Sequence, residues 1–382
     1  MGPTGCSRSA MVLGMAHSIS APMAVPAGVP RAPAKEGARP RTWPGVLLGV
    51  LLTPVAGLLL ATAARIGASP SGWSYSVGLV LVAVGLMLRA RGLWRAGLGL
   101  IALVACSRLL FADGTLLETV RLPEGGHRWV NRLVDERDGT LFAAHALVRL
   151  GKLPRSDASG FIPALEAAFD RMELAEGSVA TPAIATYLGL QSPESFDALV
   201  IPPARGATPD TAVVFLHGYA GNFAVYCWEM ARASWTISAL TVCPSVGPAG
   251  DWWSPQGAST LKATLEWLSA RGVRRFYLGG LSNGGVGASM LVNRISLPGL
   301  ELRGLVLVSG AESSAPVPQV PTLVIQGRHD SMMGTPLMRT YVERLGARAT
   351  YVELDSGHFA FLDRHLESEK AISQWLRQQE GR

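Results

Sequence analysis

The feature that most constrains this chain is an uncharged, mostly apolar run of twenty residues at positions 45–64, GVLLGVLLTPVAGLLLATAA. About 20 such residues in a helix are enough to cross the hydrocarbon layer of a bilayer. Two shorter apolar runs follow at 73–88 and 96–111. The sequence therefore predicts a membrane region over residues 45–111 with up to three transmembrane helices.

Residues 1–44 precede the first apolar run and are rich in Pro, Gly, Ala and Ser, with scattered Arg. This composition offers too few large apolar side chains to bury a core, so we expect a disordered basic tail. A cleaved signal peptide is the alternative interpretation of the first run, because the small residues at 61–63 resemble a cleavage site. The long preceding tail and the later apolar runs favour a retained helix.

The arginines around the apolar runs predict how the chain crosses the membrane. The tail and the loop at 89–95 are rich in Arg, whereas the connection at 64–74 holds only Arg65. Positively charged loops stay on the cytoplasmic side, so three crossings place everything after Phe111 in a periplasm or extracellular space. If the run at 96–111 does not cross, this orientation inverts.

The net charge of +6 is unevenly distributed along the chain. Ten basic side chains and one acidic side chain lie before residue 112, so that part carries +9 and the rest of the chain carries −3. A protein that binds nucleic-acid phosphates needs its positive charge on the folded domain. We therefore expect no nucleic-acid partner, and we expect the lipid bilayer to be a partner.

Residues 112–195 have apolar side chains at helical spacing, which predicts a helical connecting region of two or three helices. The favoured interpretation is a packing collar between the membrane and the core, and coverage of a substrate site is the less favoured one. The side chains that carry the pattern are Trp129, Leu133, Leu141, Leu147, Leu150, Phe161, Leu165 and Phe169.

From residue 196 onward, short β-branched and apolar runs alternate with amphipathic segments. This alternation is typical of an α/β domain with a mostly parallel sheet and flanking helices, which we expect over residues 196–382. The predicted strands cover residues 196–201, 211–216, 239–243, 275–281, 304–309, 322–327 and 350–354.

Ser282 lies in the sequence GLSNG, directly after the strand predicted over 275–281 and before a segment compatible with a helix. A GxSxG sequence in this context is typical of a tight turn that exposes the serine hydroxyl above a sheet, with glycines where no side chain fits. We predict that Ser282 is a catalytic nucleophile.

A serine hydroxyl needs a base that is itself held by a carboxylate. Asp330 follows the strand predicted over 322–327, and His358 follows the last predicted strand. The order Ser, Asp, His is the order used with such a turn, so we predict Asp330 as the acid and His358 as the base. Asp355 is a less favoured acid, because it lies only three residues from His358.

Two other histidines are not expected to act as the base. His217 begins the sequence HGYAGN and precedes the nucleophile, so it is expected to support the neighbouring loop, and His329 is expected to have no role. The negative oxygen of a tetrahedral intermediate needs N–H donors that are fixed in advance. We expect the backbone N–H groups of Tyr219 and Asn283 to be these oxyanion donors.

Only twelve residues, GAESSAPVPQVP, separate the strand at 304–309 from the strand at 322–327, so no cap domain fits there. We therefore expect short loops to form the walls of the site. Trp252, Trp253, Met332 and Phe359 are the candidate substrate-binding residues, with Tyr219 and Met333 adding apolar surface. Core packing is an equally weighted alternative for the two tryptophans.

Together, the segments HGYAGN, GLSNGG, GRHD and SGHF resemble the α/β-hydrolase superfamily over about residues 196–380. GLSNGG is similar to the dienelactone hydrolases and to polyhydroxyalkanoate depolymerase-like esterases. The resemblance implies the α/β-hydrolase fold, the triad of Ser282, Asp330 and His358, and the two oxyanion donors. Dienelactone hydrolases typically carry cysteine at the nucleophile position, so their substrate does not transfer to this chain.

These features predict a membrane-anchored serine hydrolase that cleaves a small-molecule or lipid-like carboxylic ester through an acyl-enzyme. A serine peptidase or an acyltransferase is the alternative with the same triad, and a non-catalytic membrane-displayed scaffold is the alternative from another class. No cofactor and no metal are expected, because the four cysteines lack metal-ligand spacing. Cys227 and Cys243 are expected on neighbouring elements, with separately buried thiols favoured over a disulfide that export would permit.

Overall fold

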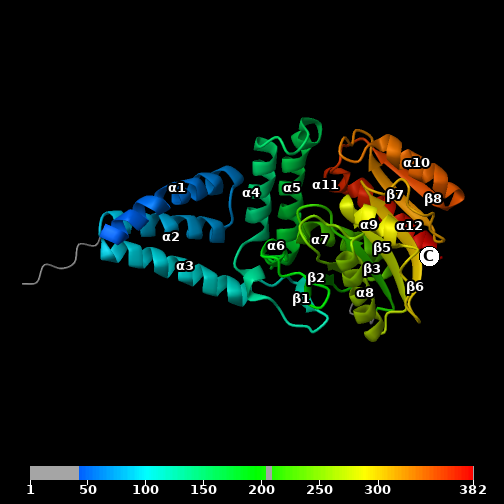
Figure 1. Ribbon diagram of the computed structural model, residues 1–382, viewed down its shortest axis with the longest axis horizontal. Helices are drawn as coiled ribbons and strands as arrows, with labels where there is room; N and C mark the ends of the chain where they lie inside the picture. Colours follow the sequence, from blue (N-terminus) through cyan, green and yellow to red (C-terminus); the bar gives the residue numbers. More distant parts are fainter. Residues whose placement is uncertain (1–42, 204–208, 382) are drawn as a thin grey trace, which may run out of the picture. The chain divides into compact units, whose positions relative to one another are not determined.

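The structure is a computed structural model that describes residues 43–203 and 209–381. The tail predicted over residues 1–44 thus lies outside the described residues, except for its last two. The described chain begins with three apolar helices, continues through a mixed segment, and ends in a sheet with helices on both faces (Figure 1).

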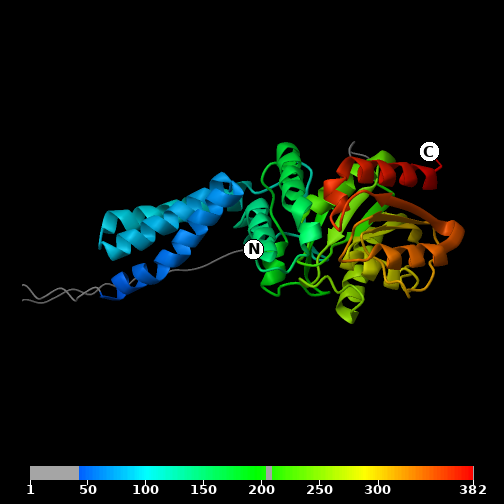
Figure 2. The ribbon, with the colours of Figure 1, turned by 90° about the horizontal axis from the view of Figure 1, so that it is seen from above.

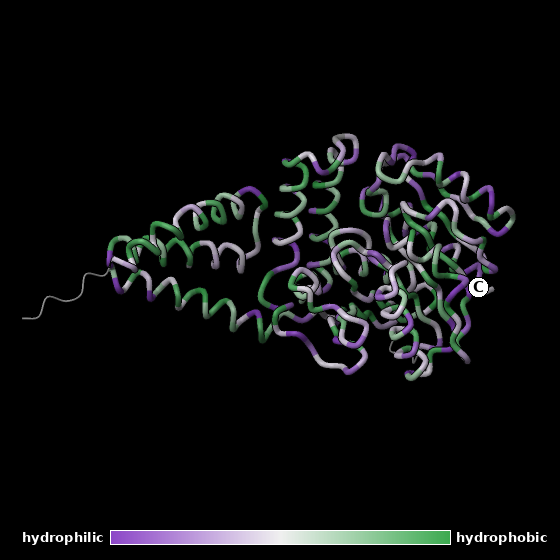
Figure 3. The backbone as a smooth tube through the Cα atoms, viewed as in Figure 1, coloured by the Kyte–Doolittle hydropathy of each residue, from purple (hydrophilic) through white to green (hydrophobic). Residues whose placement is uncertain are grey.

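The three apolar helices are α1 (Trp43–Ile66), α2 (Pro70–Met87) and α3 (Arg91–Phe111). All three are long enough and apolar enough to cross a membrane, as judged by length and composition. In Figure 3, green marks the hydrophobic residues along much of these three helices. The helices agree with the three predicted runs, although α3 begins earlier than expected, at Arg91.

Polar contacts join these helices to the segment that follows. The buried guanidinium of Arg108, near the end of α3, donates to the Asp135 carboxylate at 3.0 Å and to the Val134 carbonyl at 3.1 Å. The Ser69 hydroxyl, between α1 and α2, donates to Asp138 Oδ2 at 2.7 Å. Hydrogen bonds of this kind satisfy buried polar groups, so they hold the ends of the apolar helices to the chain around residue 135.

The sheet has eight strands in the order β1-β2-β4-β3-β5-β6-β7-β8. β2 pairs antiparallel with β1 and with β4, and the other neighbouring strands are parallel. The strands are β1 (Glu118–Leu122), β2 (Phe196–Ile201), β3 (Thr211–Leu216), β4 (Leu240–Pro244), β5 (Arg275–Leu281), β6 (Glu301–Val308), β7 (Thr322–Gly327) and β8 (Ala349–Leu354).

The sequence predicts a helical connecting region over residues 112–195. The structure differs, because the strand β1 lies within this region. β1 is a five-residue edge strand held by its register with β2, for example Val120 opposite Ala198. So short a strand leaves little periodicity to detect. The rest of the region contains the 3₁₀ helix η1 (Trp129–Arg132) and the helices α4 (Glu136–Arg149), α5 (Arg155–Glu176) and α6 (Ala183–Tyr187).

Two hydrophobic cores lie on the two faces of the sheet, because successive side chains of a strand point to opposite faces. In β3, Val213 and Phe215 face one core and Val214 and Leu216 face the other. The first core contains α5, α7 (Ala224–Ser234), α11 (Ala360–Asp363) and α12 (His365–Gln379), and the second contains α8 (Pro255–Ala270), α9 (Asn283–Leu291) and α10 (Thr335–Leu345). The 3₁₀ helices η2 (Trp235–Ile237) and η3 (Gly346–Arg348) complete the chain.

This strand order, with helices on both faces (Figure 2), is the α/β-hydrolase fold. Within it, Cys227 of α7 and Cys243 of β4 form a disulfide. The favoured expectation of two separate thiols was therefore wrong. Closing a loop of this length stabilises a fold by about 3 kcal/mol when the bridge is counted as a loss of entropy in the unfolded chain.

Candidate active site

Ser282 occupies a strained turn between β5 and α9, with φ 54° and ψ −120°. Residues with a side chain rarely adopt such angles, and the strain persists only where the surroundings impose it. Two glycines make the turn possible: a Cβ on Gly280 would lie 2.2 Å from the Gly284 backbone, and a Cβ on Gly284 would lie 2.0 Å from the Leu216 carbonyl oxygen. The turn therefore fixes Ser282 at the carboxyl end of β5.

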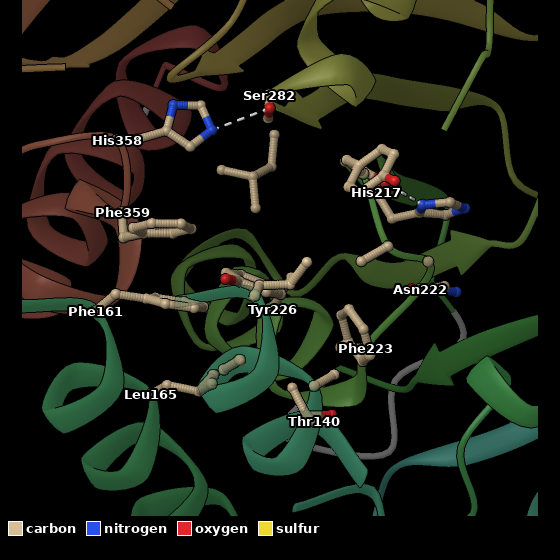
Figure 4. A pocket seen from close by; sticks show the side chains of 18 of the residues that line it. Thr140, Phe161, Leu165, His217, Asn222, Phe223, Tyr226, Ser282, His358 and Phe359 are labelled. Atoms are coloured by element: carbon tan, nitrogen blue, oxygen red, sulfur yellow. Dashed lines mark hydrogen bonds between the residues drawn. The ribbon is translucent and has the colours of Figure 1, made fainter. Parts of the chain in front are cut away.

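Ser282, His358 and Asp330 are brought together from three separate strand ends. Ser282 Oγ lies 3.0 Å from His358 Nε2, and His358 Nδ1 lies 2.9 Å from Asp330 Oδ2. All three side chains are buried. Figure 4 shows the imidazole pointing toward the Ser282 hydroxyl. In this geometry, His358 can receive the serine proton while Asp330 accepts the other imidazole N–H.

The Asp330 carboxylate is oriented by its own loop at the end of β7. Its Oδ1 accepts hydrogen bonds from the backbone N–H groups of Met332 and Met333, at 2.9 and 2.8 Å. Its Oδ2 accepts a hydrogen bond from Gln326 Nε2 at 2.9 Å, in addition to the one from His358. The carboxylate cannot rotate without breaking several of these contacts.

His217 is buried and does not contact Ser282 through its ring. Its Nε2 accepts a hydrogen bond from the Val246 N–H at 3.1 Å, so its Nδ1 carries the proton that it donates to the Gly218 carbonyl at 2.8 Å. Burial lowers the pKa of the His217 imidazole to about 4. The ring is therefore neutral near pH 7, and it supports the loop after β3.

His329 and Asp355 are exposed and pair with each other at 3.1 Å. The Asp355 side chain therefore bonds to His329, and Asp330 is the carboxylate that bonds to His358.

The loop after β3 runs directly beside Ser282. A Cβ on Gly218 would lie only 3.1 Å from the Ser282 Cβ. Among the described residues, the backbone N–H groups of Tyr219 and Asn283 have no hydrogen-bond acceptor. The Asn283 side chain is anchored separately, donating to the Ala249 carbonyl at 2.8 Å. Both N–H groups are therefore available next to Ser282, where an oxyanion would form.

A cavity of about 110 Å³ opens beside Ser282 and His358. Met332 and Phe359, two of the residues expected near a substrate, line it, as does Tyr219. Most of the other lining side chains are apolar, and many come from α4 and α5, which lie between β1 and β2 in the chain, and from the start of α7. They include Ala143, Ala144 and Leu147 of α4, Phe161 and Leu165 of α5, and Phe223 and Tyr226 at the start of α7.

The expected positions of Trp252 and Trp253 need correction, because neither lines this cavity. Trp252 is fully buried, and its indole N–H donates to the His217 carbonyl at 2.9 Å. Trp253 faces a different hollow, beside Lys262 and Leu297. The tryptophans follow a strand end in sequence, but the turn at Gly250 directs them into and around the core.

The short loops expected to form the walls do line the cavity, as at residues 218–223 and Met332, but they do not form the walls alone. α4 and α5, which the sequence analysis favoured as a packing collar, form one side of the cavity in addition to packing on the core. Helical periodicity reveals that a helix has an apolar face, but it does not reveal what that face covers.

Sequence reasoning also missed Asp157, in the first turn of α5. Its Oδ1 accepts a hydrogen bond from the His358 backbone N–H at 2.7 Å, and its Oδ2 accepts one from the Ser331 hydroxyl. No motif marks this residue, because its partners lie more than 170 positions away.

Within residues 43–203 and 209–381, no group of three or more His, Cys, Asp or Glu side chains is placed to hold a metal ion.

No protein-family model matches this chain, and no curated protein matches it. Solved structures that are similar include an alpha-beta serine hydrolase homologue from Coxiella burnetii, at 16% identity over 48% of this chain and 92% of that chain, with a TM-score of 0.38. Others are a serine hydrolase without lid from Xanthomonas campestris (20% identity, 48% and 89% coverage, TM-score 0.40) and Est1E from Butyrivibrio proteoclasticus (13%, 49% and 96%, 0.39). Likenesses of this size identify no substrate.

One buried carboxylate near the cavity makes folding depend on pH. Glu136, at the start of α4, accepts a hydrogen bond from the Val225 N–H at 3.3 Å, and burial raises its pKa to about 8. The folded chain therefore keeps this proton after an unfolded chain has lost it. The contribution of this group to the free energy of unfolding is fully present below pH 4.5. It is lost as the pH rises toward 8.

We therefore expect the melting temperature of the full-length protein in detergent to fall between pH 5 and pH 8, with a contribution of at most about 1.4 kcal/mol per pH unit from this one group. Glu136→Gln should flatten that dependence, because the amide does not titrate. The exposed Glu194 provides a control, and Glu194→Gln should keep the wild-type slope. Equal slopes in wild type and Glu136→Gln would reject this role for Glu136.

Proposed function

We propose that this protein is a membrane-anchored serine esterase that cleaves a carboxylic ester through an acyl-enzyme. One observation carries the proposal: the hydrogen-bonded series from Ser282 Oγ through His358 to Asp330, on a strained turn, beside an apolar cavity. A scaffold without catalytic activity has no need to hold a strained serine against a buried imidazole.

In the first half of the proposed reaction, the ester carbonyl lies against Ser282 Oγ. His358 Nε2 takes the serine proton as Oγ attacks the carbonyl carbon, and Asp330 stabilises the imidazolium that forms. The N–H groups of Tyr219 and Asn283 donate to the negative oxygen of the tetrahedral intermediate. The intermediate collapses, the carbon–oxygen ester bond breaks, and His358 gives its proton to the departing alcohol.

In the second half, water replaces the alcohol. His358 takes a proton from the water as its oxygen attacks the acyl carbon, and the same two N–H groups stabilise the second oxyanion. Collapse returns the proton to Ser282 Oγ and releases the carboxylic acid. Asp330 is unchanged throughout, because it acts only through its hydrogen bond to the imidazole.

The direct test uses the full-length protein in detergent. A fluorophosphonate probe should form one covalent adduct per chain, and an uncharged p-nitrophenyl ester should slow this labelling by competing for the site. The same protein should hydrolyse that ester and leave the matching p-nitroanilide nearly untouched. Absence of both labelling and ester turnover would contradict the proposal, and faster anilide cleavage would support the peptidase alternative.

We further propose that the catalytic domain is exported. The arginines of the tail and of the loop at 89–95 favour the cytosolic side, and three crossings then place the sheet outside. The Cys227–Cys243 disulfide supports this arrangement, because disulfides persist in oxidising compartments.

The topology prediction concerns a reporter fused after the last residue. Alkaline phosphatase at this position should be active, because it requires an oxidising compartment, and a fluorescent protein that folds only in the cytosol should be dark. As a control, the same reporters fused within the loop at 89–95 should give the opposite pattern. An inactive phosphatase with a bright cytosolic reporter at the C-terminus would refute three crossings.

A further inference from the structure

The cavity beside Ser282 extends from Ser282 and His358 toward the helices α4 and α5. In Figure 4, Ser282 and His358 lie at one end, and Leu165 of α5 and Thr140 of α4 lie at the other. Tyr226 and Phe161 lie between the two ends in the same view. A group attached to a carbonyl carbon at Ser282 Oγ can therefore extend between α4, α5 and α7.

The lining determines the charge that this space accepts. Of the described residues that line it, none is Asp, Glu, Lys or Arg, and the buried His217 is neutral. His358 is the one other imidazole in the lining, and it is occupied by Ser282 and Asp330. An ionised group placed here would lose its hydration without gaining an opposite charge, so the cavity excludes charged chains.

The size of the cavity limits the length of the chain. A cavity of about 150 Å³ holds benzene, with its six carbons, so about 110 Å³ accommodates roughly four carbons in the same proportion. α4 forms one wall of this space, because Thr140, Ala143, Ala144 and Leu147 share one helical face and all line it. Small side chains at 143 and 144 leave the space open.

We propose that this cavity is an acyl-binding site for a short, uncharged acyl chain of about four carbons, which makes the substrate a short-chain carboxylic ester. This inference rests on the proposed esterase function. Each methylene that enters the cavity is worth about fourfold in kcat/KM, so a butanoyl ester should exceed an acetyl ester by about 15-fold.

The test keeps the alcohol constant and varies the acyl chain. The full-length protein in detergent is assayed with p-nitrophenyl acetate, butanoate, octanoate and dodecanoate. Butanoate should give the highest kcat/KM, and dodecanoate should be at least tenfold lower. Ala143→Leu fills the space and should reverse the preference toward acetate, whereas Ala146→Leu, on the same helix but outside the lining, should keep the wild-type profile.

Fluorophosphonate labelling distinguishes a failure of the esterase proposal from a failure of the short-chain acyl site. If neither wild type nor variants label, the esterase proposal itself fails. If all label normally but activity rises steadily to dodecanoate, or Ala143→Leu matches Ala146→Leu in chain-length preference, the short-chain site is rejected while the esterase proposal stands.

A second inference follows from a different set of contacts, those of Asp157. This side chain is 4% exposed and joins the loop of the base to the loop of the acid, because it accepts from the His358 N–H at 2.7 Å and from the Ser331 hydroxyl. Gly357 makes room for it, since a Cβ at that position would lie 2.5 Å from Asp157 Oδ1. We infer that Asp157 is a positioning residue that sets the distance between His358 and Ser282.

The inference predicts a change in turnover without a change in binding. Asp157→Ala should lower kcat and the rate of fluorophosphonate labelling by about tenfold or more while leaving KM within about twofold, because misplaced catalytic groups slow the chemical step. Asp157→Asn should restore both rates to within about threefold, because its amide keeps an acceptor for the His358 N–H and a donor for Ser331.

A control variant on the same helix shows whether the loss of rate is specific to Asp157. Asp170→Asn changes an exposed carboxylate of α5 and should leave both rates at the wild-type level. If Asp157→Ala does not fold, Ser331→Ala removes one of the two contacts and should still slow labelling by about two- to threefold. Wild-type labelling by Asp157→Ala, or equal losses in the Ala and Asn variants, would overturn the inference.

Discussion

Ser282→Ala is expected to remove all fluorophosphonate labelling and to lower kcat by about 10⁶-fold, the loss that removal of a nucleophile produces in other triad enzymes. The alanine retains the strained turn and the glycine contacts of Gly280 and Gly284, so the fold should remain. It removes the one oxygen within hydrogen-bond distance of His358 Nε2 among the described residues.

A matched control for this variant is Ser309→Ala. Ser309 is also a buried serine with positive φ, at 47°, and it lies at the end of β6, the strand next to the nucleophile strand. Its hydroxyl has no partner among the described residues, so the variant should label at the wild-type rate. Covalent labelling of Ser282→Ala to the wild-type extent would show that another residue is the nucleophile.

Asp330→Asn is expected to lower kcat by about 10⁴-fold with little change in KM. The N–H groups of Met332 and Met333 require an acceptor and will retain the amide oxygen at their position. The amide NH₂ then faces His358 Nδ1 and donates to it. The imidazole must therefore carry its proton on Nε2, and it can no longer receive the proton of Ser282.

The control for this prediction is Asp355→Asn, the carboxylate nearest to His358 in sequence. Asp355 bonds to His329 on the surface, so its variant should retain wild-type kcat. Both proteins are compared by ester hydrolysis and by the rate of fluorophosphonate labelling. A large loss in Asp355→Asn with none in Asp330→Asn would exchange the two assignments.

The parts of this molecule that the sequence predicts well are those whose signals are local. The strands at 196–201, 211–216 and 275–281 have the bounds that their apolar runs predict, and glycines and prolines mark their ends. Ser282 follows its strand directly, Asp330 and His358 follow theirs within a short loop, and parallel strands end at one edge of a sheet. Their meeting was therefore predictable without any knowledge of side-chain contacts.

The parts that could not be predicted depend on contacts between distant segments. Trp252 and Trp253 follow a strand end, as a substrate-binding residue often does, but close packing on Gly257 and Gly287 places Trp252 in the core. α4 shows an apolar face, yet its sequence contains no information on whether that face meets a core or a cavity. The Cys227–Cys243 bridge likewise depends on how closely α7 approaches β4, which spacing alone does not reveal.

The position of α4 and α5 between β1 and β2 has a consequence for proteolytic release of the sheet domain. A protease that cuts between α5 and β2 would free a fragment with Ser282, Asp330 and His358 but without one side of the cavity and without Asp157. A cut between α3 and β1 would keep all of these elements together. Shedding at the first position would therefore end the activity, and only shedding at the second would yield a soluble enzyme.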